Sequence, residues 1–522
     1  MTSCHDKYPA ARVSVMLPTY NRRNSFRHAI ASALRQYHNN VQVVVVNDGG
    51  DDVSDIVKSF DDERICHIDR KQNRGKAYSL NEGLAEAKGE YVAYLDDDDM
   101  FYPNHLSALV NAMENRNDIG LAYSMLYRTK CRTQENGQRL VLSKMVDISR
   151  DFDRWFMLYY NHVLHVSMMH RKELLEKTGG YNEDIDVLID WDMTRRMCFF
   201  TDFYHVKQIT GEYYSPIDGG DRLSIRQRRD EKKYLKNVLA IRNTRPPKPW
   251  TKIKDLSIIY APKTLDKNAC QTIGTIWGNT FYPYQLYLPL TRAEMEKFDA
   301  GMPNVVTVEV EQESAETERI NRAIGACKGD YVAVVSTGLE MPEMWLERSL
   351  YALINCGSRN DAYRIETSDE NAWGFVAEKS VLENAMKTNA DASVQDCLTA
   401  AGVKIRQAAE NELPFKFDRV LAQAQINEQN GNWIEAAKLY EYISENFRED
   451  FWMRSMQAAA YFKGGYAMKA QAICQDINRS NPTVDTLLTE AKVSKKNKDF
   501  CGAISLLNRA EDILEGKQLQ WT

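Results

Sequence analysis

The segment "GEYVAYLDDDDMFYPNHL", residues 89–106, places four consecutive aspartates directly after a short apolar run. The run has the length and the β-branched and aromatic content of a strand. Adjacent carboxylates repel one another, so four in a row require a compensating charge. A solvated acidic turn or the start of a helix is one explanation. A divalent cation, whose charge offsets the repulsion, is the one favoured here.

Strand-like and helical patterns alternate around this segment. Apolar, β-branched runs occupy residues 13–18 and 41–48, and a weaker third lies at 63–69. Helical spacing of apolar residues separates them at 25–37 and 76–89. This alternation predicts an α/β fold with a parallel sheet, which binds ligands beyond the carboxyl ends of its strands. Asp48 and the four aspartates fall at those ends.

The composition is that of an ordinary globular protein with several domains. The 522 residues are 43% apolar and 27% charged, with a formal net charge of −6. That charge favours neither nucleic acid nor anionic lipid. We expect no secretory signal and no membrane span, because no run of 18 apolar residues occurs. Ten scattered cysteines without metal-ligand spacing indicate reduced thiols and a cytoplasmic protein.

A second segment repeats the first without its acids. Residues 329–346 read "GDYVAVVSTGLEMPEMWL", and laying residue 81 on residue 321 aligns about 25 positions in order. Chance similarity is the alternative, but the matched order favours a duplication. Ser336, Thr337, Gly338 and Leu339 stand where the aspartates stand in the first copy. Neutral side chains do not hold a divalent ion, so the second copy is predicted to be inert and retained for packing or acceptor binding.

The last hundred residues change to a helical pattern. Aromatic residues recur at 433, 466 and 500, at spacings of 33 and 34. A period near 34 resembles tetratricopeptide repeats, with generic helical hairpins as the alternative. Such repeats provide a surface for a protein partner or for self-association. The predicted domains are residues 1–240, a basic and proline-rich linker at 241–252, a degenerate α/β domain at 253–415 and the repeats at 416–522.

Four motifs of the first domain resemble, in order, the signatures of family-two glycosyltransferases with the GT-A fold. They are "SVMLPTYNR" (14–22), "VVVVNDGGDD" (43–52), "NRGKAYSLNEGLAEAKGEYVAYLDDDD" (73–99) and "GGYNEDIDVLIDWDMTRRM" (179–197). The resemblance covers about residues 12–225. It implies an inverting enzyme that transfers a sugar from a nucleoside diphosphate, with Mn²⁺ or Mg²⁺ as cofactor.

The resemblance also implies roles for individual residues. The metal ligands would be Asp98 of a D-x-D element and Asp218, which stands where relatives often have histidine. Asp190 would be the base, although Ile189 replaces the family's preceding glutamate; a local alternative is that Asp190 caps a helix. The residues expected to contact the nucleotide-sugar are Pro18, Thr19, Tyr20, Arg22, Asp48, Arg74, Lys76, Asp96, Asp97 and Arg222.

The leading functional hypothesis is therefore a metal-dependent glycosyltransferase with a UDP-sugar as the expected donor. A protein is the first choice of acceptor, because helical repeats are common platforms for binding proteins. A glycan or a hydroxyl-bearing nucleic acid is the alternative acceptor. A scaffold in which both α/β copies are inert is the rival class, and the intact acids of the first copy speak against it.

Overall fold

The computed structural model describes residues 12–133, 139–146, 150–217, 231–298, 301–367, 372–387, 392–409, 412–447, 451–480 and 482–515. The chain forms two compact units. The first combines Met1–Asn237 with Phe417–Thr522, and the second is Val238–Lys416. The C-terminal helices, which the sequence suggested as a domain of their own, therefore pack with the N-terminal segment. The second unit is inserted between the two parts of the first.

The first unit is built on a mixed nine-stranded sheet with the order β3-β2-β1-β4-β8-β6-β9-β5, to which β7 adds beside β6. Its first four strands are parallel, and β8 joins β4 in the antiparallel direction. The strands are β1 (Val13–Thr19), β2 (Val41–Asn47), β3 (Ile65–Asp69), β4 (Tyr91–Tyr94), β5 (Met100–Phe101), β6 (Ile119–Thr133), β7 (Arg139–Val146), β8 (Met168–Arg171) and β9 (Asp202–Pro216).

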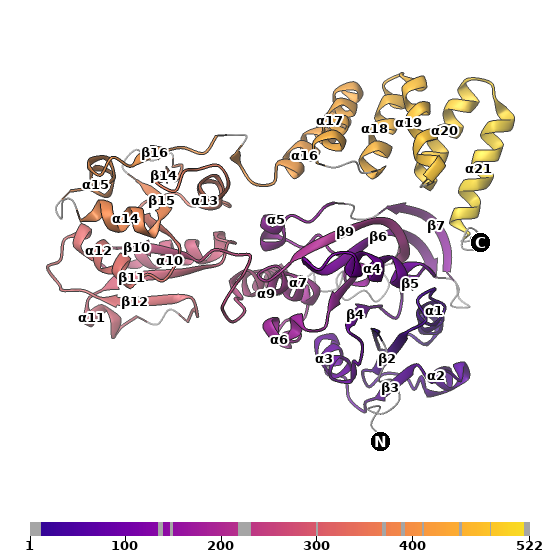
Figure 1. Ribbon diagram of the computed structural model, residues 1–522, viewed down its shortest axis with the longest axis horizontal. Helices are drawn as coiled ribbons and strands as arrows, with labels where there is room; N and C mark the ends of the chain where they lie inside the picture. The colour runs from indigo at the N-terminus through magenta and orange to yellow at the C-terminus, as the bar shows by residue number, and fades with distance from the viewer. Residues whose placement is uncertain are drawn as a thin grey trace. The chain divides into compact units, whose positions relative to one another are not determined.

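Helices cover this sheet and bury its apolar strands (Figure 1). Every residue of β2 is buried, as expected for a parallel strand with both faces covered. The helices are α1 (Arg23–Leu34), α2 (Ser54–Phe60), α3 (Lys76–Glu86), α4 (His105–Glu114), α5 (Arg154–Tyr159), α6 (Leu174–Thr178) and α7 (Ile189–Met197), with the short 3₁₀ helix η2 at His165–Ser167.

The second unit contains a seven-stranded sheet with the order β12-β11-β10-β13-β15-β14-β16. Its strands are β10 (Leu256–Tyr260), β11 (Tyr284–Leu290), β12 (Val305–Glu309), β13 (Tyr331–Val335), β14 (Asp361–Arg364), β15 (Gly374–Glu378) and β16 (Lys404–Arg406). The helices from the unit boundary onward are α9 (Glu231–Asn243), α10 (Lys267–Asn279), α11 (Arg292–Met295), α12 (Glu316–Ala326), α13 (Glu347–Asn355), α14 (Lys379–Met386) and α15 (Val394–Ala400).

The two sheets share the order and direction of seven strands. In each, four parallel strands are followed by an antiparallel strand, β8 or β15. Next comes a strand from earlier in the sequence, β6 or β14, and then a last strand parallel to it, β9 or β16. The strand β8 of the first sheet corresponds in this way to β15 of the second.

A local contact recurs at the same place in both sheets. Ser14 lies opposite Gln42, and Ser257 lies opposite Gln285. The backbone N–H of Gly89 donates to Oγ of Ser14 at 2.8 Å, and that of Gly329 donates to Oγ of Ser257 at 3.1 Å. A Cβ at either glycine would meet the serine backbone nitrogen at 2.5 or 2.7 Å. Glycine is therefore required at both positions.

Six helices complete the first unit as successive helical hairpins, in which each helix from α17 to α21 packs against the next (Figure 1). They are α16 (Lys416–Gln429), α17 (Trp433–Asn446), α18 (Phe451–Lys463), α19 (Ala467–Ser480), α20 (Val484–Lys496) and α21 (Phe500–Leu514). Small residues let neighbouring helices approach closely, because Ala436, Ala437, Ala460 and Ala470 are fully buried.

The hairpins pack on β6, β7 and β9 through a shared apolar cluster. At their start, the Arg150 guanidinium binds both carboxylate oxygens of Asp418, at 2.6 and 3.0 Å. At their end, Nζ of Lys144 in β7 donates to the carbonyl oxygen of Ile513 at 3.0 Å and binds Glu212 of β9 at 2.7 Å. The helical segment is thus joined to the rest of the first unit by apolar packing, by the Arg150–Asp418 ion pair and by the hydrogen bond from Lys144.

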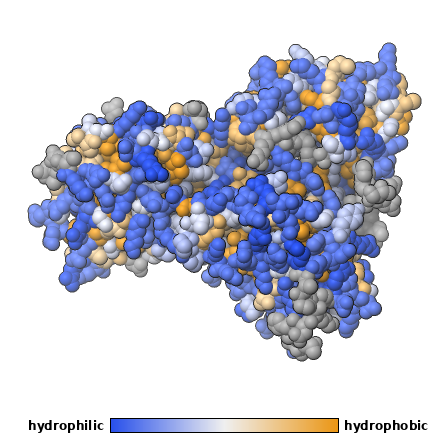
Figure 2. Space-filling view, in the orientation of Figure 1, coloured by the Kyte–Doolittle hydropathy of each residue, from blue (hydrophilic) through white to orange (hydrophobic). Residues whose placement is uncertain are grey.

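The surface visible in Figure 2 is mostly hydrophilic, with scattered hydrophobic residues. Within the described part of the chain, no helix has both the length and the apolarity that crossing a bilayer requires. Eight of the described cysteines are free, whereas Cys66 of β3 is disulfide-bonded. The expectation of reduced thiols therefore does not hold for Cys66.

Candidate active site

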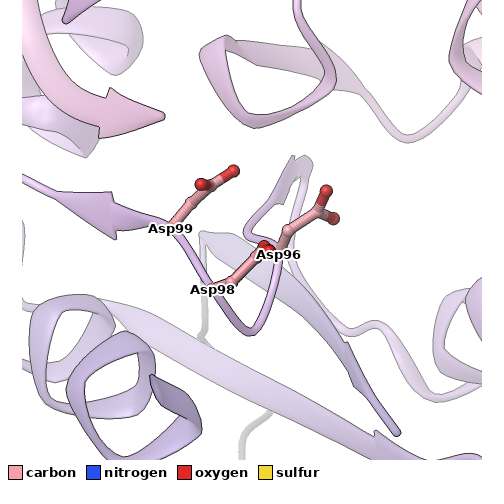
Figure 3. Close-up of side chains that lie close together, drawn as sticks. All are labelled: Asp96, Asp98 and Asp99. Carbon is pink, nitrogen blue, oxygen red and sulfur yellow. The ribbon is translucent and has the colours of Figure 1, made fainter. Parts of the chain in front are cut away.

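The four aspartates form a turn at the carboxyl end of β4, as the sequence predicted. The N–H of Asp99 donates to the carbonyl oxygen of Asp96 at 3.1 Å and closes this turn. One carboxylate oxygen from each of Asp96, Asp98 and Asp99 lies within 4.8 Å of the others (Figure 3). Three hard oxygen donors from one turn suit Mg²⁺ or Mn²⁺, which take carboxylates together with water and substrate phosphates. The donor set therefore fits the expected cofactor.

Asp97 points away from this group. Its carboxylate accepts hydrogen bonds from Oγ1 of Thr19 at 2.8 Å and from the N–H of Tyr20 at 3.3 Å. Burial, followed by the neighbouring Asp98 carboxylate, raises the pKa of Asp97 to about 6. Asp97 thus ties the turn after β1 to the acidic turn, and its described contacts are with protein groups. Asp99, which the sequence did not assign, takes a place in the candidate metal group.

Two cations predicted to contact the nucleotide-sugar neutralise the aspartates. NH1 of Arg22 lies 3.1 Å from Asp97 and 2.5 Å from Asp98. Nζ of Lys76 lies 2.6 Å from Asp96. Burial opposes ionisation of Asp96, but the Lys76 ammonium prevails and lowers the pKa of that carboxyl.

Asp48 follows β2 and organises the loop before α3. It accepts the N–H groups of Arg74 at 2.8 Å and Gly75 at 2.9 Å, and the guanidinium of Arg70 also binds it. The Arg74 guanidinium lies 3.3 Å from the ring centroid of Tyr78. Asp48 and Arg74 therefore meet at the carboxyl edge of the sheet. Arg70 was missed in the sequence, where nothing distinguished it from other basic loop residues.

Asp190 lies in the first turn of α7. Its Oδ2 accepts a hydrogen bond from the side-chain amide of Asn161 at 2.9 Å. Leu188, with a φ of 63°, occupies the N-cap position, so the alternative that Asp190 caps this helix is wrong. Burial opposes the charge of Lys76, but Asp96 and, to a smaller extent, Asp190 raise the pKa of this lysine. The Lys76 ammonium is thus stabilised by the acidic turn and by the predicted base.

The three histidines at 162, 165 and 170 are buried. His165 approaches the acidic turn, with Nδ1 3.8 Å from a carboxylate oxygen of Asp96. Pro18 is the last residue but one of β1, directly before Thr19. Asp218 and Arg222, the remaining predicted site residues, lie outside the residues that the structure describes.

The same edge of the second unit has a different chemistry. Ser336 follows β13, and its Oγ accepts the N–H of Trp373 at 2.8 Å. The buried guanidinium of Arg319 donates to the carbonyl oxygens of Pro262 at 2.7 Å and Pro289 at 2.9 Å. An arginine side chain thus joins the carboxyl ends of β10 and β11, at the place where Asp48 holds a loop in the first unit.

Comparison with known proteins agrees with the first unit's site. Residues 14–178 match the family described as Glycosyl transferase family 2. An uncharacterised glycosyltransferase of Rickettsia typhi is 31% identical over 187 residues, which are 35% of this chain and 57% of the relative. The glycosyltransferase YwdF of Bacillus subtilis, also uncharacterised, is 25% identical over 227 residues, or 43% of this chain and 81% of the relative.

Solved structures give partial superpositions. TarS of S. aureus in complex with UDP-GlcNAc matches with a TM-score of 0.34 and 16% identity, over 44% of this chain and 66% of that one. A mannosyltransferase from Pyrobaculum calidifontis with GDP-Man and Mn²⁺ matches with a TM-score of 0.33 and 18% identity, over 46% and 67%. The chain covers just over half of the length of the Rickettsia typhi relative. In the first unit, the chain is thus similar to family 2 glycosyltransferases over residues 14–178.

Proposed function

We propose that the first unit transfers a sugar from a nucleoside-diphosphate sugar to an acceptor hydroxyl, with inversion at the anomeric carbon. The observation that carries this proposal is the group of carboxylate oxygens from Asp96, Asp98 and Asp99 at the ligand edge of the sheet. UDP is the expected nucleotide and Mn²⁺ or Mg²⁺ the expected cofactor.

The roles of the side chains follow from their contacts. A divalent ion on the acidic turn supplies charge neutralisation for the diphosphate that leaves. Arg22 and Lys76, now paired with the aspartates, orient the phosphate oxygens. The amide of Asn161 fixes Oδ2 of Asp190, and Oδ1 accepts the proton of the attacking hydroxyl. Proton removal opposite the departing diphosphate is what an inverting displacement requires.

The test is a screen of UDP-, GDP- and TDP-sugars, scored by release of the free nucleoside diphosphate with Mn²⁺, Mg²⁺ or EDTA. Asp190→Asn is expected to reduce turnover at least about 100-fold, because general base catalysis contributes on this scale. Its metal-dependent binding of the nucleotide, measured by calorimetry, should persist. Asp98→Asn should lose the metal-dependent binding of the nucleotide, and turnover with it.

Asp118→Asn is the matched control, because Asp118 is an exposed aspartate of the same unit paired with Arg116. It should retain wild-type turnover. Full activity in EDTA, or in Asp190→Asn, would refute the proposed mechanism. Absence of metal-dependent nucleotide binding by the wild-type chain would favour the scaffold alternative.

The second unit is proposed to be a degenerate copy of the first without transfer activity. The shared strand order and the repeated Ser–Gly contact support a duplication. Ser336 in place of the acids and the Arg319 guanidinium at the strand ends support the loss of activity. The chain would then have a single active site, and Asp98→Asn would abolish all transfer.

A cytoplasmic enzyme acting on a protein remains the proposed setting, with a glycan or a nucleic-acid hydroxyl as the alternative. The helical hairpins support the protein acceptor, because stacked hairpins provide extended binding surfaces. Intact-mass spectrometry of candidate proteins incubated with the donor found in the screen is the measurement. Transfer to a free glycan, but to none of the proteins, would favour the alternative acceptor.

A further inference from the structure

Arg139, the first residue of β7, contacts the main chain of the acidic turn. NH1 of Arg139 donates to the carbonyl oxygen of Asp98 at 2.7 Å. The guanidinium also lies over the ring of Tyr214, with its carbon 4.4 Å from the ring centroid. Both side chains are half-buried. The described contacts of this cation are thus a carbonyl oxygen and an aromatic ring, not a carboxylate.

Tyr214 also holds the acidic turn directly. Its backbone N–H donates to Oδ1 of Asp99 at 2.9 Å. The position of Tyr214 is set by β9, which pairs with β5 directly after the turn, where Met100 lies opposite Glu212. Two of the three aspartates in the candidate metal group are therefore held from β7 and β9, Asp98 by its carbonyl oxygen and Asp99 by its carboxylate.

The contact of Arg139 differs in kind from those of Arg22 and Lys76. Those two cations bind carboxylate oxygens of Asp98 and Asp96, which are the atoms that a divalent ion would use. A hydrogen bond to the carbonyl oxygen leaves the carboxylates open, so it can persist when the ion is bound. A planar guanidinium that stacks on a ring is also held in one orientation, which suits a fixed support.

Arg139 affects metal binding in two ways of opposite sign. Its positive charge repels a divalent ion, which by itself weakens binding. Its hydrogen bond fixes the main chain from which the Asp98 carboxylate projects, and so reduces the cost of assembling the three ligands. Loss of the side chain would tighten metal binding if the charge dominated and weaken it if the hydrogen bond dominated. We expect the hydrogen bond to dominate, because the charge is partly exposed and therefore screened by water and salt.

We propose that Arg139 is a positioning residue of the candidate metal site. It holds the main chain of Asp98 so that this carboxylate stays with the other two of the group. The ring of Tyr214 keeps the guanidinium in place. The inference rests on the proposed function, because it assigns a support to the metal site of that function. It adds to the site a strand, β7, that carries none of the residues predicted from the sequence.

The test is the affinity for Mn²⁺ without nucleotide, measured by calorimetry on the full chain. Arg139→Ala should weaken this affinity about 3- to 10-fold, the range for one net hydrogen bond. Arg139→Lys, which keeps the charge and a donor but not the planar stack, should recover part of the loss. Arg116→Ala is the matched control and should bind Mn²⁺ as the wild type does. Arg116 also lies over a tyrosine, Tyr204 near the other end of β9, but it pairs with Asp118 at the surface.

A role in binding phosphate, for which the guanidinium also has donors, gives a different result. With the donor found in the screen, the positioning role requires Arg139→Ala to raise the Mn²⁺ concentration for half-maximal turnover by the factor that it weakens Mn²⁺ binding. A higher KM for the sugar nucleotide at saturating Mn²⁺, with unchanged affinity for Mn²⁺ alone, would assign Arg139 to the phosphates and overturn the positioning role.

Urea unfolding of each variant ensures that a loss of affinity is read from folded protein. If Arg139→Ala does not fold, Arg139→Met, which keeps an apolar stem over the ring, takes its place with the same expected loss. Affinity for Mn²⁺ that equals or exceeds that of the wild type would overturn the inference and leave the proposed function standing. Failure of the wild-type chain to bind Mn²⁺, with or without a nucleoside diphosphate, would overturn both.

Discussion

The buried ion pair between Lys144 and Glu212 allows a quantitative prediction. Lys144 is 3% exposed and Glu212 1% exposed, and the pair joins β7 to β9. The carboxylate of Glu212 also accepts the hydroxyls of Tyr102 at 2.8 Å and Thr129 at 2.9 Å. Lys144→Met keeps much of the side-chain volume but leaves Glu212 without its cation. The variant therefore tests the energetic cost of an uncompensated buried carboxylate.

The size of the loss in unfolding free energy depends on whether Glu212 stays ionised or takes up a proton. Breaking a buried pair typically costs about 3–5 kcal/mol. The carboxylate can take up a proton instead, which from an ordinary glutamate pKa of about 4.3 costs about 3.7 kcal/mol at pH 7. We therefore expect a loss of about 3–4 kcal/mol in the free energy of unfolding at pH 7. At pH 5 the same arithmetic gives about 1 kcal/mol, since protonation is then nearly free.

The measurement is urea-induced unfolding at both pH values, followed by hydrogen-exchange mass spectrometry of peptides from β6, β7 and β9. Lys438→Met is the matched control, because Lys438 pairs with Glu435 at the same 2.7 Å but both side chains are about 60% exposed. It should cost under about 0.5 kcal/mol. The double variant Lys144→Met with Glu212→Gln should be more stable than Lys144→Met alone.

Equal losses in Lys144→Met and Lys438→Met would refute the reasoning, because burial is the main difference between the two pairs. A loss in Lys144→Met that stays constant from pH 7 to pH 5 would refute the charge explanation in particular. It would assign the effect to packing or to the lost contact with the carbonyl oxygen of Ile513.

Three further predictions concern the acidic turn, acid stability and a close backbone approach. Asp99→Asn should weaken Mn²⁺ binding about 10-fold or more in calorimetry, because it removes one of three carboxylates. Burial lowers the pKa of His105 to about 3 and that of His170 to about 4. As pH falls below about 6.5, these histidines therefore take up protons in the unfolded chain but not in the folded one. The free energy of unfolding should fall by about 2 kcal/mol per histidine between pH 7 and pH 5. Unchanged stability in urea titrations at these two pH values would contradict this. Gly89→Ala, whose Cβ would meet the nitrogen of Ser14 at 2.5 Å, should destabilise the first unit by about 1–3 kcal/mol in thermal unfolding, and a neutral result would contradict the packing argument.

The sequence predicted the strands and the acidic turn because their signals are local. Runs at 13–18 and 41–48 became β1 at Val13–Thr19 and β2 at Val41–Asn47, since buried parallel strands are continuously apolar. Asp48 and the four aspartates could be placed at the ligand edge because they directly follow predicted parallel strands. The similarity between the two segments was visible because a serine and a glycine recur and make one backbone contact in each sheet.

The remaining features depend on contacts between distant segments. The position of β1 relative to β4 decides which of the four aspartates contacts Thr19. Four identical residues in a row give no local signal for that choice. The approach of His165 to Asp96 depends on the pairing of β8 with β4. In the sequence, Lys144 and Glu212 have the pattern of exposed charges on strands. In the structure, α21 packs over them. Long-range burial of charge has no local sequence signal.

The insertion of the second unit between residues 237 and 417 has a consequence for biosynthesis. Helices α20 and α21, which cover β7 and supply the carbonyl of Ile513, are among the last parts of the first unit to leave the ribosome. At typical rates of about 5–20 residues per second, they follow β9 by tens of seconds. During that time the apolar face of β6, β7 and β9 is not yet covered by α20 and α21. The second unit is synthesised in full before these helices are made. The nascent chain would then need protection from aggregation until α21 is made.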